Sequence, residues 1–246
     1  MFFRTIKMKV AEKIFNRISG IPDGSTFRYN ELLLEPEEYT AAAKAIERLI
    51  KGGIIMRAST GLFYKPKHTV FGKLKPDERE LLKPYLFKNG QRVGYITGPA
   101  LYNRLGLTTQ VPKNIKIATR DKRLELILGT LKVTSIKSYA EITDENVCYL
   151  EYLDAIKDFK TIPDLNKEMA IKRLVSGISQ LQDRKMLITQ ALEYPPRVRA
   201  LTGAILELIN KNEDLNTLRK SLNPLSTFSF SLNADQLATA QNWRII

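Results

Sequence analysis

Residues 40–65 read TAAAKAIERLIKGGIIMRASTGLFYK. Apolar residues recur at intervals of three and four positions through residues 40–51, which places them on one face of a helix. Gly52 and Gly53 end that helix. Two β-prone runs then flank a four-residue turn, at residues 54–57 and 62–65, and this pattern predicts a β-hairpin. The stretch therefore predicts a helix that is followed directly by a hairpin.

The sequence ahead of this stretch predicts two more helices. Apolar residues at every fourth position predict a helix over residues 5–18. The glycines and the proline of residues 20–24 break it, and residues 26–29 form a short extended run. Asn30 then caps a brief second helix, which Pro36 ends.

Three helices followed by a hairpin is the element order of a winged helix-turn-helix, and residues 44–57 and 61–64 closely resemble that family. The resemblance implies a third helix that enters the major groove of double-stranded DNA, where base edges differ, and a hairpin that touches the adjacent backbone. A solvated helix face beside a scaffolding hairpin is the alternative. The predicted DNA-binding residues are Tyr39, Thr40, Ala41, Lys44, Arg48 and Lys51 on the third helix, Arg57, Ser59, Thr60, Lys65 and Lys67 on the wing, and Arg28 and Tyr29 at the start of the second helix.

The whole chain has a net charge of +13. The positive excess is concentrated in its first half. Residues 1–67 hold twelve lysines and arginines against seven acidic residues, residues 68–137 hold fourteen against five, and residues 138–246 hold thirteen against fourteen. Nucleic acids and anionic membranes both attract such charge. An additional basic patch, which can extend a DNA footprint or meet an acidic partner, comprises Lys113, Lys116, Arg120, Lys122, Arg123 and Lys132, with Lys137 beside it.

Length and composition indicate a globular protein of two domains. The 246 residues exceed the usual span of one domain, and 43% hydrophobic with 26% charged residues is ordinary for a folded chain. No apolar run is long enough to cross a bilayer and no signal peptide is evident, so we expect a cytoplasmic protein without a membrane partner. The single cysteine, Cys148, agrees with a reducing compartment, and its apolar neighbours predict a packed thiol.

The expected organisation is a winged helix over residues 1–67, a basic linker over residues 68–93 with one short helix near residues 77–82, and a second domain over residues 94–246. In the second domain, Thr97 is the expected cap of a helix that ends before Gly106. Strands are predicted at residues 114–119, 124–128 and 131–136, a strand or helix at 147–153, and helices within 166–192 and 196–210. The expected fold class is mixed α+β, with an α/β second domain that ends in helices.

Residues 94–112, GYITGPALYNRLGLTTQVP, and the IKIAT of residues 115–119 resemble the AbiEi-type antitoxins of bacterial abortive-infection systems. Residues 222–226 and the Asn242-Trp243 pair look like the C-terminal end of that group. The resemblance implies an N-terminal winged helix that represses its own promoter and a C-terminal domain that counters a nucleotidyltransferase-like toxin. Direct contact with the toxin and self-association stay open. A simple winged-helix repressor with an effector or dimerisation domain is the alternative.

The sequence contains few residues in patterns that are typical of a catalytic site. The single histidine, His68, lies in the expected linker, which argues against a histidine triad or a multi-histidine metal site. No Walker loop or dinucleotide fingerprint occurs. We therefore expect a non-enzymatic protein with no catalytic residue, no metal and no cofactor. The enzymatic alternative is a magnesium-dependent DNA nuclease that uses Asp121, Glu125 and Lys132 near the predicted strands.

Overall fold

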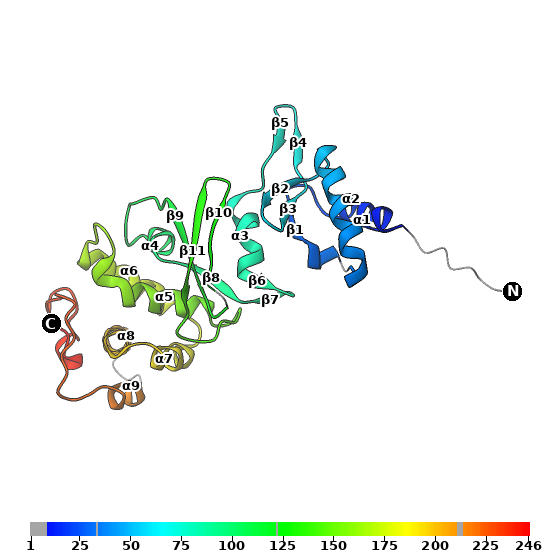
Figure 1. Ribbon diagram of the computed structural model, residues 1–246. Coiled ribbons are helices and arrows are strands. Elements are labelled where there is room, and N and C mark those ends of the chain that lie inside the picture. Colours follow the sequence, from blue (N-terminus) through cyan, green and yellow to red (C-terminus); the bar gives the residue numbers. More distant parts are fainter. Residues whose placement is uncertain (1–8, 33, 122, 211–213) are drawn as a thin grey trace. The chain divides into compact units, whose positions relative to one another are not determined.

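The computed structural model describes residues 9–32, 34–121, 123–210 and 214–246 (Figure 1). The fold is mixed α and β, as the sequence predicts. The chain divides into two compact units. The first comprises Met1–Tyr85 with Ile127–Thr130, and the second comprises Leu86–Leu126 with Leu131–Ile246.

Two amphipathic helices form the base of the first unit. Helix α1 (Val10–Ser19) buries Ile14 and Ile18, and helix α2 (Tyr39–Lys51) buries a stripe that includes Ile46. The helix expected over residues 5–18 is thus present from Val10, and its first residues lie outside the described part of the chain. Both stripes belong to one hydrophobic cluster, whose buried members are Ile14, Ile18, Phe27, Leu32, Ala42, Ala45, Ile46, Ile55 and Phe63.

Two 3-10 helices, Tyr29–Leu32 and Pro36–Glu38, stand where the sequence predicts one short helix. The prediction that Pro36 ends a helix is wrong, because Pro36 begins the second 3-10 helix. The fixed φ of proline suits a first helical position, where no N–H is needed. Glu35 and Glu38 complete this start with a capping box.

A three-stranded antiparallel sheet completes the winged helix. Its strands β1 (Thr26–Arg28), β2 (Met56–Ser59) and β3 (Leu62–Tyr64) lie in the order β1-β3-β2. Phe63 of the central strand stands opposite Phe27 on one side and Arg57 on the other. The hairpin predicted from residues 54–65 is confirmed, although its first strand begins two residues later than expected.

The linker prediction for residues 68–93 is wrong, because this segment is folded. It contributes to β4 (Lys67–Thr69) and holds β5 (Gly72–Leu74), α3 (Glu78–Leu86), β6 (Phe87–Lys88) and β7 (Gln91–Arg92). Strands β4 and β5 pair as one hairpin and β6 and β7 as another. The predicted helix at residues 77–82 is present but continues to Leu86.

Helix α3 continues through Pro84, although proline has no N–H to donate to the carbonyl of Glu80. The Thr26 hydroxyl donates to that carbonyl at 2.9 Å, and the Thr26 N–H donates to the Glu80 carboxylate at 3.4 Å. The backbone acceptor that proline leaves unpaired is therefore satisfied by β1. This contact fastens α3 to the winged helix, so the first unit extends to Tyr85 instead of ending at the predicted residue 67.

A four-stranded mixed sheet in the order β10-β11-β9-β8 lies mostly in the second unit. Strand β9 (Asn114–Thr119) is antiparallel to β8 (Gly94–Thr97) and parallel to β11 (Leu131–Lys137), which also pairs with β10 (Glu125–Leu128). The strands predicted at residues 114–119, 124–128 and 131–136 are therefore confirmed. Strand β8 was not predicted.

Helix α4 (Pro99–Arg104) follows β8, and Gly106 lies just past its end in the left-handed region, as predicted. Thr97 does not cap this helix. Gly98 takes the N-cap position with φ of 68°, and a Cβ there would meet the side chain of Lys116 at 2.9 Å. Only glycine fits both the backbone conformation and the space.

Helices make up most of the remaining chain. The segment at residues 147–153, left open between strand and helix, is the start of α5 (Val147–Asp158). Helix α8 (Pro196–Ile209) is buried over most of its length and contacts α5, α6, α7 and α9, as Figure 1 illustrates. The predicted helical regions hold α6 (Lys167–Ser179), α7 (Arg184–Leu192) and α8, and they are followed by α9 (Asn216–Lys220).

A buried carboxylate joins the sheet of this unit to its helices. Asp154 of α5 is 2% exposed, and its oxygens accept hydrogen bonds from four side chains. Burial and this carboxylate raise the pKa of the Tyr95 and Tyr194 phenols, which therefore remain neutral donors. The four donors are the hydroxyls of Tyr95 at 2.9 Å, Thr97 at 2.7 Å and Tyr194 at 3.1 Å, and the ammonium of Lys157 at 3.3 Å.

Asp154→Ala should lower the free energy of unfolding by about 3–5 kcal/mol, because it removes the shared acceptor of three buried hydroxyls and one of the two carboxylates that pair with Lys157. The matched control is Glu168→Ala. Glu168 also pairs with a lysine, Lys172 at 2.6 Å, but both side chains are exposed. Urea denaturation of both variants measures the difference, and equal stability losses would contradict the role assigned to the buried carboxylate.

Candidate nucleic-acid interface

Helix α2 presents a polar face opposite its buried stripe. Tyr39 is 44% exposed at the start of the helix. The side chains of Thr40, Ala41, Lys44, Arg48 and Lys51 are also exposed. All six residues predicted on this helix therefore lie on its solvent side, as the 3.6-residue period requires.

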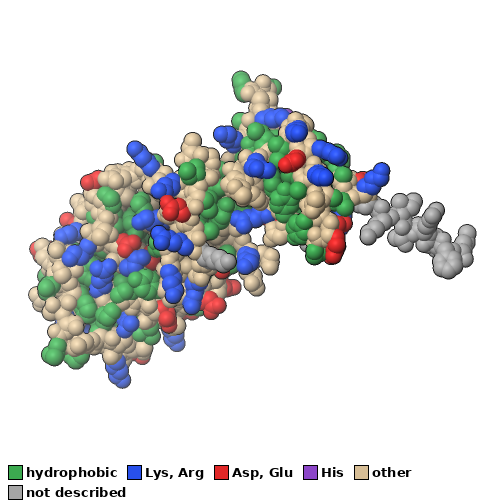
Figure 2. Space-filling view, in the orientation of Figure 1, with side chains coloured by type: hydrophobic (Ala, Val, Ile, Leu, Met, Phe, Trp, Pro, Cys, Tyr) green, Lys and Arg blue, Asp and Glu red, His purple; other side chains and the backbone are tan. Residues whose placement is uncertain are grey.

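The cations on this face have no polar partner within the described chain. Lys44, Arg48 and Lys51 form neither an ion pair nor a side-chain hydrogen bond with any described residue. By contrast, Lys13 of α1 pairs with Glu38 at 2.8 Å. Figure 2 shows lysine and arginine side chains over the region that Figure 1 labels α1 and α2. The α2 cations are thus free to meet phosphate or base-edge acceptors.

The wing supplies a second exposed edge. Arg57 of β2 is exposed, and its guanidinium lies 5.7 Å from the ring centroid of Phe63. Thr60 is exposed in the turn, whereas Ser59 is half-buried. Gly61 takes φ of 73°, which allows this short turn. Arg57 and Thr60 are therefore accessible to the sugar-phosphate backbone of a DNA duplex.

Arg28 and Tyr29 are less accessible than the sequence predicts. The Arg28 guanidinium stacks over the Tyr85 ring at 4.7 Å from its centroid, and its Nε is buried without a hydrogen-bond partner in the described chain. Tyr29 packs edge-on against Phe63 at 5.2 Å, and burial raises the pKa of its phenol. Both side chains are half-buried. Both side chains therefore pack within the first unit, and only part of each polar end is accessible to DNA.

Lys65, one of the predicted phosphate contacts, has partners within the first unit. Its ammonium donates to the carbonyls of Ser19 at 3.2 Å and Ile21 at 3.0 Å, and it pairs with Asp23 at 3.2 Å. It therefore fixes the loop between α1 and β1. Lys67 is exposed on β4 and makes no such contact with any described residue, so it stays a candidate for phosphate.

The basic patch of the second unit is distributed over several elements. Lys116 of β9 is exposed, and Lys132 of β11 stands opposite Asn114, two residues from Lys116 in the parallel register. Lys132 pairs with Glu125 at 3.4 Å. Lys113, Arg120 and Arg123 are exposed in the loops that flank β9, and Lys137 is exposed at the end of β11. Lys122 lies outside the described residues.

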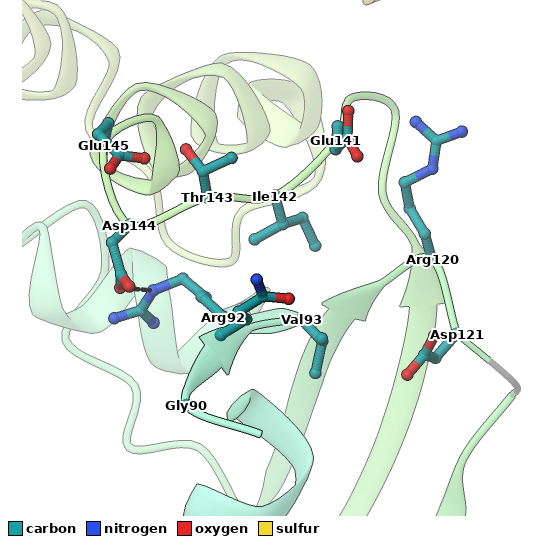
Figure 3. A pocket seen from close by; sticks show the side chains of 11 residues that line it. Gly90, Arg92, Val93, Arg120, Asp121, Glu141, Ile142, Thr143, Asp144 and Glu145 are labelled. Atoms are coloured by element: carbon teal, nitrogen blue, oxygen red, sulfur yellow. Dashed lines mark hydrogen bonds and ion pairs between the residues drawn. The ribbon is translucent and has the colours of Figure 1, made fainter. Parts of the chain in front are cut away.

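Arg120 and Asp121 line a cavity of about 680 Å³ in the second unit (Figure 3). Figure 3 shows their side chains pointing in different directions, whereas Arg92 is turned toward Asp144, with which it pairs at 2.6 Å. The other charged lining residues are Glu141 and Glu145. The lining mixes both signs of charge, so this cavity does not form a continuous positive surface for phosphate.

The candidate catalytic groups are placed as follows. Glu125 pairs with Lys132, and Asp121 lies at the cavity, where its N–H donates to Thr119 at 3.1 Å. No cluster of three potential metal ligands occurs within the described residues. Burial raises the pKa of the Cys148 thiol, which agrees with the packed thiol expected from its neighbours.

Comparison with known families places the chain. A family model described as a family of unknown function, DUF6088, matches residues 13–183. This chain belongs to the DUF6088 family. The match begins in α1 and ends at Asp183, the cap of α7, so the DUF6088 region includes the winged helix and the mixed sheet.

Among solved structures, this DUF6088 chain is similar to the crystal structure of the Rv2827c protein from Mycobacterium tuberculosis. The two are 12% identical, with a TM-score of 0.56, and the alignment covers 97% of this chain and 91% of the other. The likeness therefore shows a shared fold. No curated protein matches the sequence. Within the described residues, every helix is too short or too polar to span a membrane.

Sequence reasoning missed the β4–β5 hairpin and the contact that holds its base. The Lys73 ammonium donates to the Gly53 carbonyl at 2.7 Å, just after α2. A Cβ at Gly53 would collide with that ammonium, and Gly53 also takes φ of 67°. The sequence Val70-Phe71-Gly72 between short polar runs could have indicated this hairpin, but residues 68–93 were interpreted as a linker.

Lys65→Ala should lower the free energy of unfolding by about 1–2 kcal/mol, because three partners of its ammonium lose their charged donor. Lys67→Ala, the matched control, should change it by less than about 0.5 kcal/mol. Chemical denaturation of the two variants tests this assignment. If Lys67→Ala were the more destabilising change, the structural role given to Lys65 would be wrong.

Proposed function

We propose that this chain is a sequence-specific double-stranded-DNA-binding antitoxin, which represses its own promoter and counteracts a nucleotidyltransferase-like toxin. The observation that carries the DNA-binding half is the face of α2. It is exposed and basic, its cations lack partners within the described chain, and a wing follows it. A helix of this kind fits the major groove, where side chains of its N-terminal half reach base edges.

Individual side chains on α2 have distinct roles in this proposal. Lys44 and Arg48 lie one turn apart, so both can reach one stretch of groove, contacting guanine acceptors or phosphate. Thr40 precedes Lys44 by one turn and can donate to phosphate or meet a thymine methyl group. Arg57 and Thr60 of the wing contact the adjacent backbone, which positions the protein without reading sequence.

The antitoxin half of the proposal rests on the resemblance of residues 94–119. In the structure these residues build β8, α4 and β9, and they bury Leu101, Tyr102 and Leu107 in the core of the second unit. They therefore serve as scaffold, and a toxin would meet other surfaces of the same unit. A simple repressor with an effector or dimerisation domain is the alternative, and it requires no toxin.

The double variant Lys44→Ala with Arg48→Ala should weaken binding to the chain's own upstream DNA by about 30-fold or more. Two good base-edge or phosphate contacts together contribute at least about 2 kcal/mol of affinity. Fluorescence anisotropy with labelled upstream duplex and an unrelated duplex measures both affinity and specificity.

The matched control for that experiment is Lys185→Ala with Lys220→Ala, which removes the same charge from exposed positions in the second unit. It should leave specific affinity nearly unchanged. Equal affinity of the α2 double variant and the wild type for upstream DNA would refute the proposed recognition helix.

The two halves of the proposed function should separate genetically. The same α2 double variant should release a reporter fused to the upstream promoter, yet still rescue growth when co-expressed with the toxin encoded by a neighbouring gene. Both proteins are supplied from an unrelated promoter, so that repression cannot produce the rescue. Failure of the wild-type chain to rescue growth would leave the simple-repressor alternative.

A further inference from the structure

The hairpin formed by β4 and β5 has a hydrophobic tip. Its register pairs His68 with Lys73 and Thr69 with Gly72, which leaves Val70 and Phe71 as the two residues of the turn. They are 95% and 97% exposed, more than any other large hydrophobic residue in the described chain. Figure 2 shows hydrophobic side chains at the tip of the protrusion that Figure 1 labels β4 and β5.

The turn itself does not require these side chains. Gly72 takes φ of 110°, and the Thr69 hydroxyl donates to the Gly72 carbonyl at 3.0 Å and accepts from the Phe71 N–H at 3.3 Å. Thr69 and Gly72 thus build the turn. Polar turn residues usually occupy such a tip. Val70 and Phe71 are almost fully exposed within the described part of the chain, so their apolar surface is available to a partner.

The hairpin that carries this tip is cationic. No aspartate or glutamate occurs from residue 66 to residue 76, which hold three lysines and His68. Lys67 and Lys75 are exposed and have no polar partner in the described chain. In duplex DNA, stacked bases lie between two rows of phosphates. The apolar tip is complementary to the stacked bases, and the free cations are complementary to the phosphates.

The base of the hairpin is tied to the recognition helix. Lys73 bonds the carbonyl of Gly53, which follows the end of α2 at Lys51. Strand β4 also begins three residues after the end of the wing strand β3. The tip is therefore held in the same unit as α2 and is presented together with it.

We infer that the β4–β5 hairpin is a wedge, which inserts Val70 and Phe71 between adjacent base pairs from the minor groove while Lys67 and Lys75 contact the flanking phosphates. This inference rests on the proposed DNA binding by α2 and adds a second, distortion-dependent contact to it. Apolar wedges of this kind unstack a base step and kink the duplex, so recognition depends on how easily that step deforms.

The test uses the full chain and a duplex that the wild-type protein selects from a random-sequence pool, with 2-aminopurine placed at successive adenines. Wild type should raise 2-aminopurine fluorescence several-fold at one step. Val70→Ser with Phe71→Ser should abolish that rise and weaken binding about 10-fold, whereas Phe71→Leu should retain part of both effects.

Two controls accompany the wedge variant. Leu225→Ser changes another residue that is 92% exposed and should behave as wild type. Lys67→Ala with Lys75→Ala should keep the fluorescence rise while lowering the slope of log affinity against log salt by about two. Thermal melting of each variant checks that the exposed substitutions leave the fold intact.

Specific results would overturn the wedge. If wild type binds the selected duplex through Lys44 and Arg48 but produces no fluorescence rise, or if the double serine variant matches wild type, the wedge is wrong and the proposed function stands. If wild type binds no duplex, both fail. If the tip mediates binding only to vesicles of phosphatidylcholine and phosphatidylglycerol, and duplex binding is unaffected by its loss, the tip serves a membrane and the wedge is wrong.

Discussion

The packing of α2 against α1 is the constraint on which the candidate interface depends. Ile46 and two alanines of α2 share one cluster with Ile14 and Ile18 of α1. Because a helix turns once in 3.6 residues, burying that stripe forces the opposite stripe into solvent. That opposite stripe holds Lys44 and Arg48. The same apolar contacts that stabilise the unit therefore orient its cations, and no separate interaction is needed to aim them.

Phe63 connects this pair of helices to the wing. It lies on the central strand of the sheet, at 5.8 Å from the ring of Phe27 and 5.2 Å from that of Tyr29, with the Arg57 guanidinium 5.7 Å away. One buried ring thus fixes the first strand and the wing arginine at once. Tyr29 shows the consequence, because a residue placed by sequence among DNA contacts is half-buried as part of this packing.

The sequence predicted the elements whose patterns are local. The stripe of α2, the hairpin after Gly53 and three of the four strands of the mixed sheet follow from periodicity and turn residues. The errors arose where long-range contacts decide the outcome. The helix expected only near residues 77–82 continues through Pro84, because Thr26 satisfies the carbonyl that proline leaves unpaired. Lys65 has the charge of a phosphate contact, but its partners at Ser19, Ile21 and Asp23 lie more than forty residues away.

Charge counted along the chain also differs from charge in the fold. Residues 68–137 have the largest positive excess, but Arg92 and Arg104 pair with Asp144 and Glu151 from the later segment, and Lys73 bonds a backbone carbonyl. Part of that excess is therefore neutralised by carboxylates that a count by segment assigns elsewhere. The winged helix has a smaller excess, and its Asp23 and Glu38 pair with Lys65 and Lys13. On the exposed face of α2, three cations, Lys44, Arg48 and Lys51, outnumber one carboxylate, Glu47. Phosphate meets local charge at close range because salt screens the rest, so the smaller excess forms the stronger candidate interface.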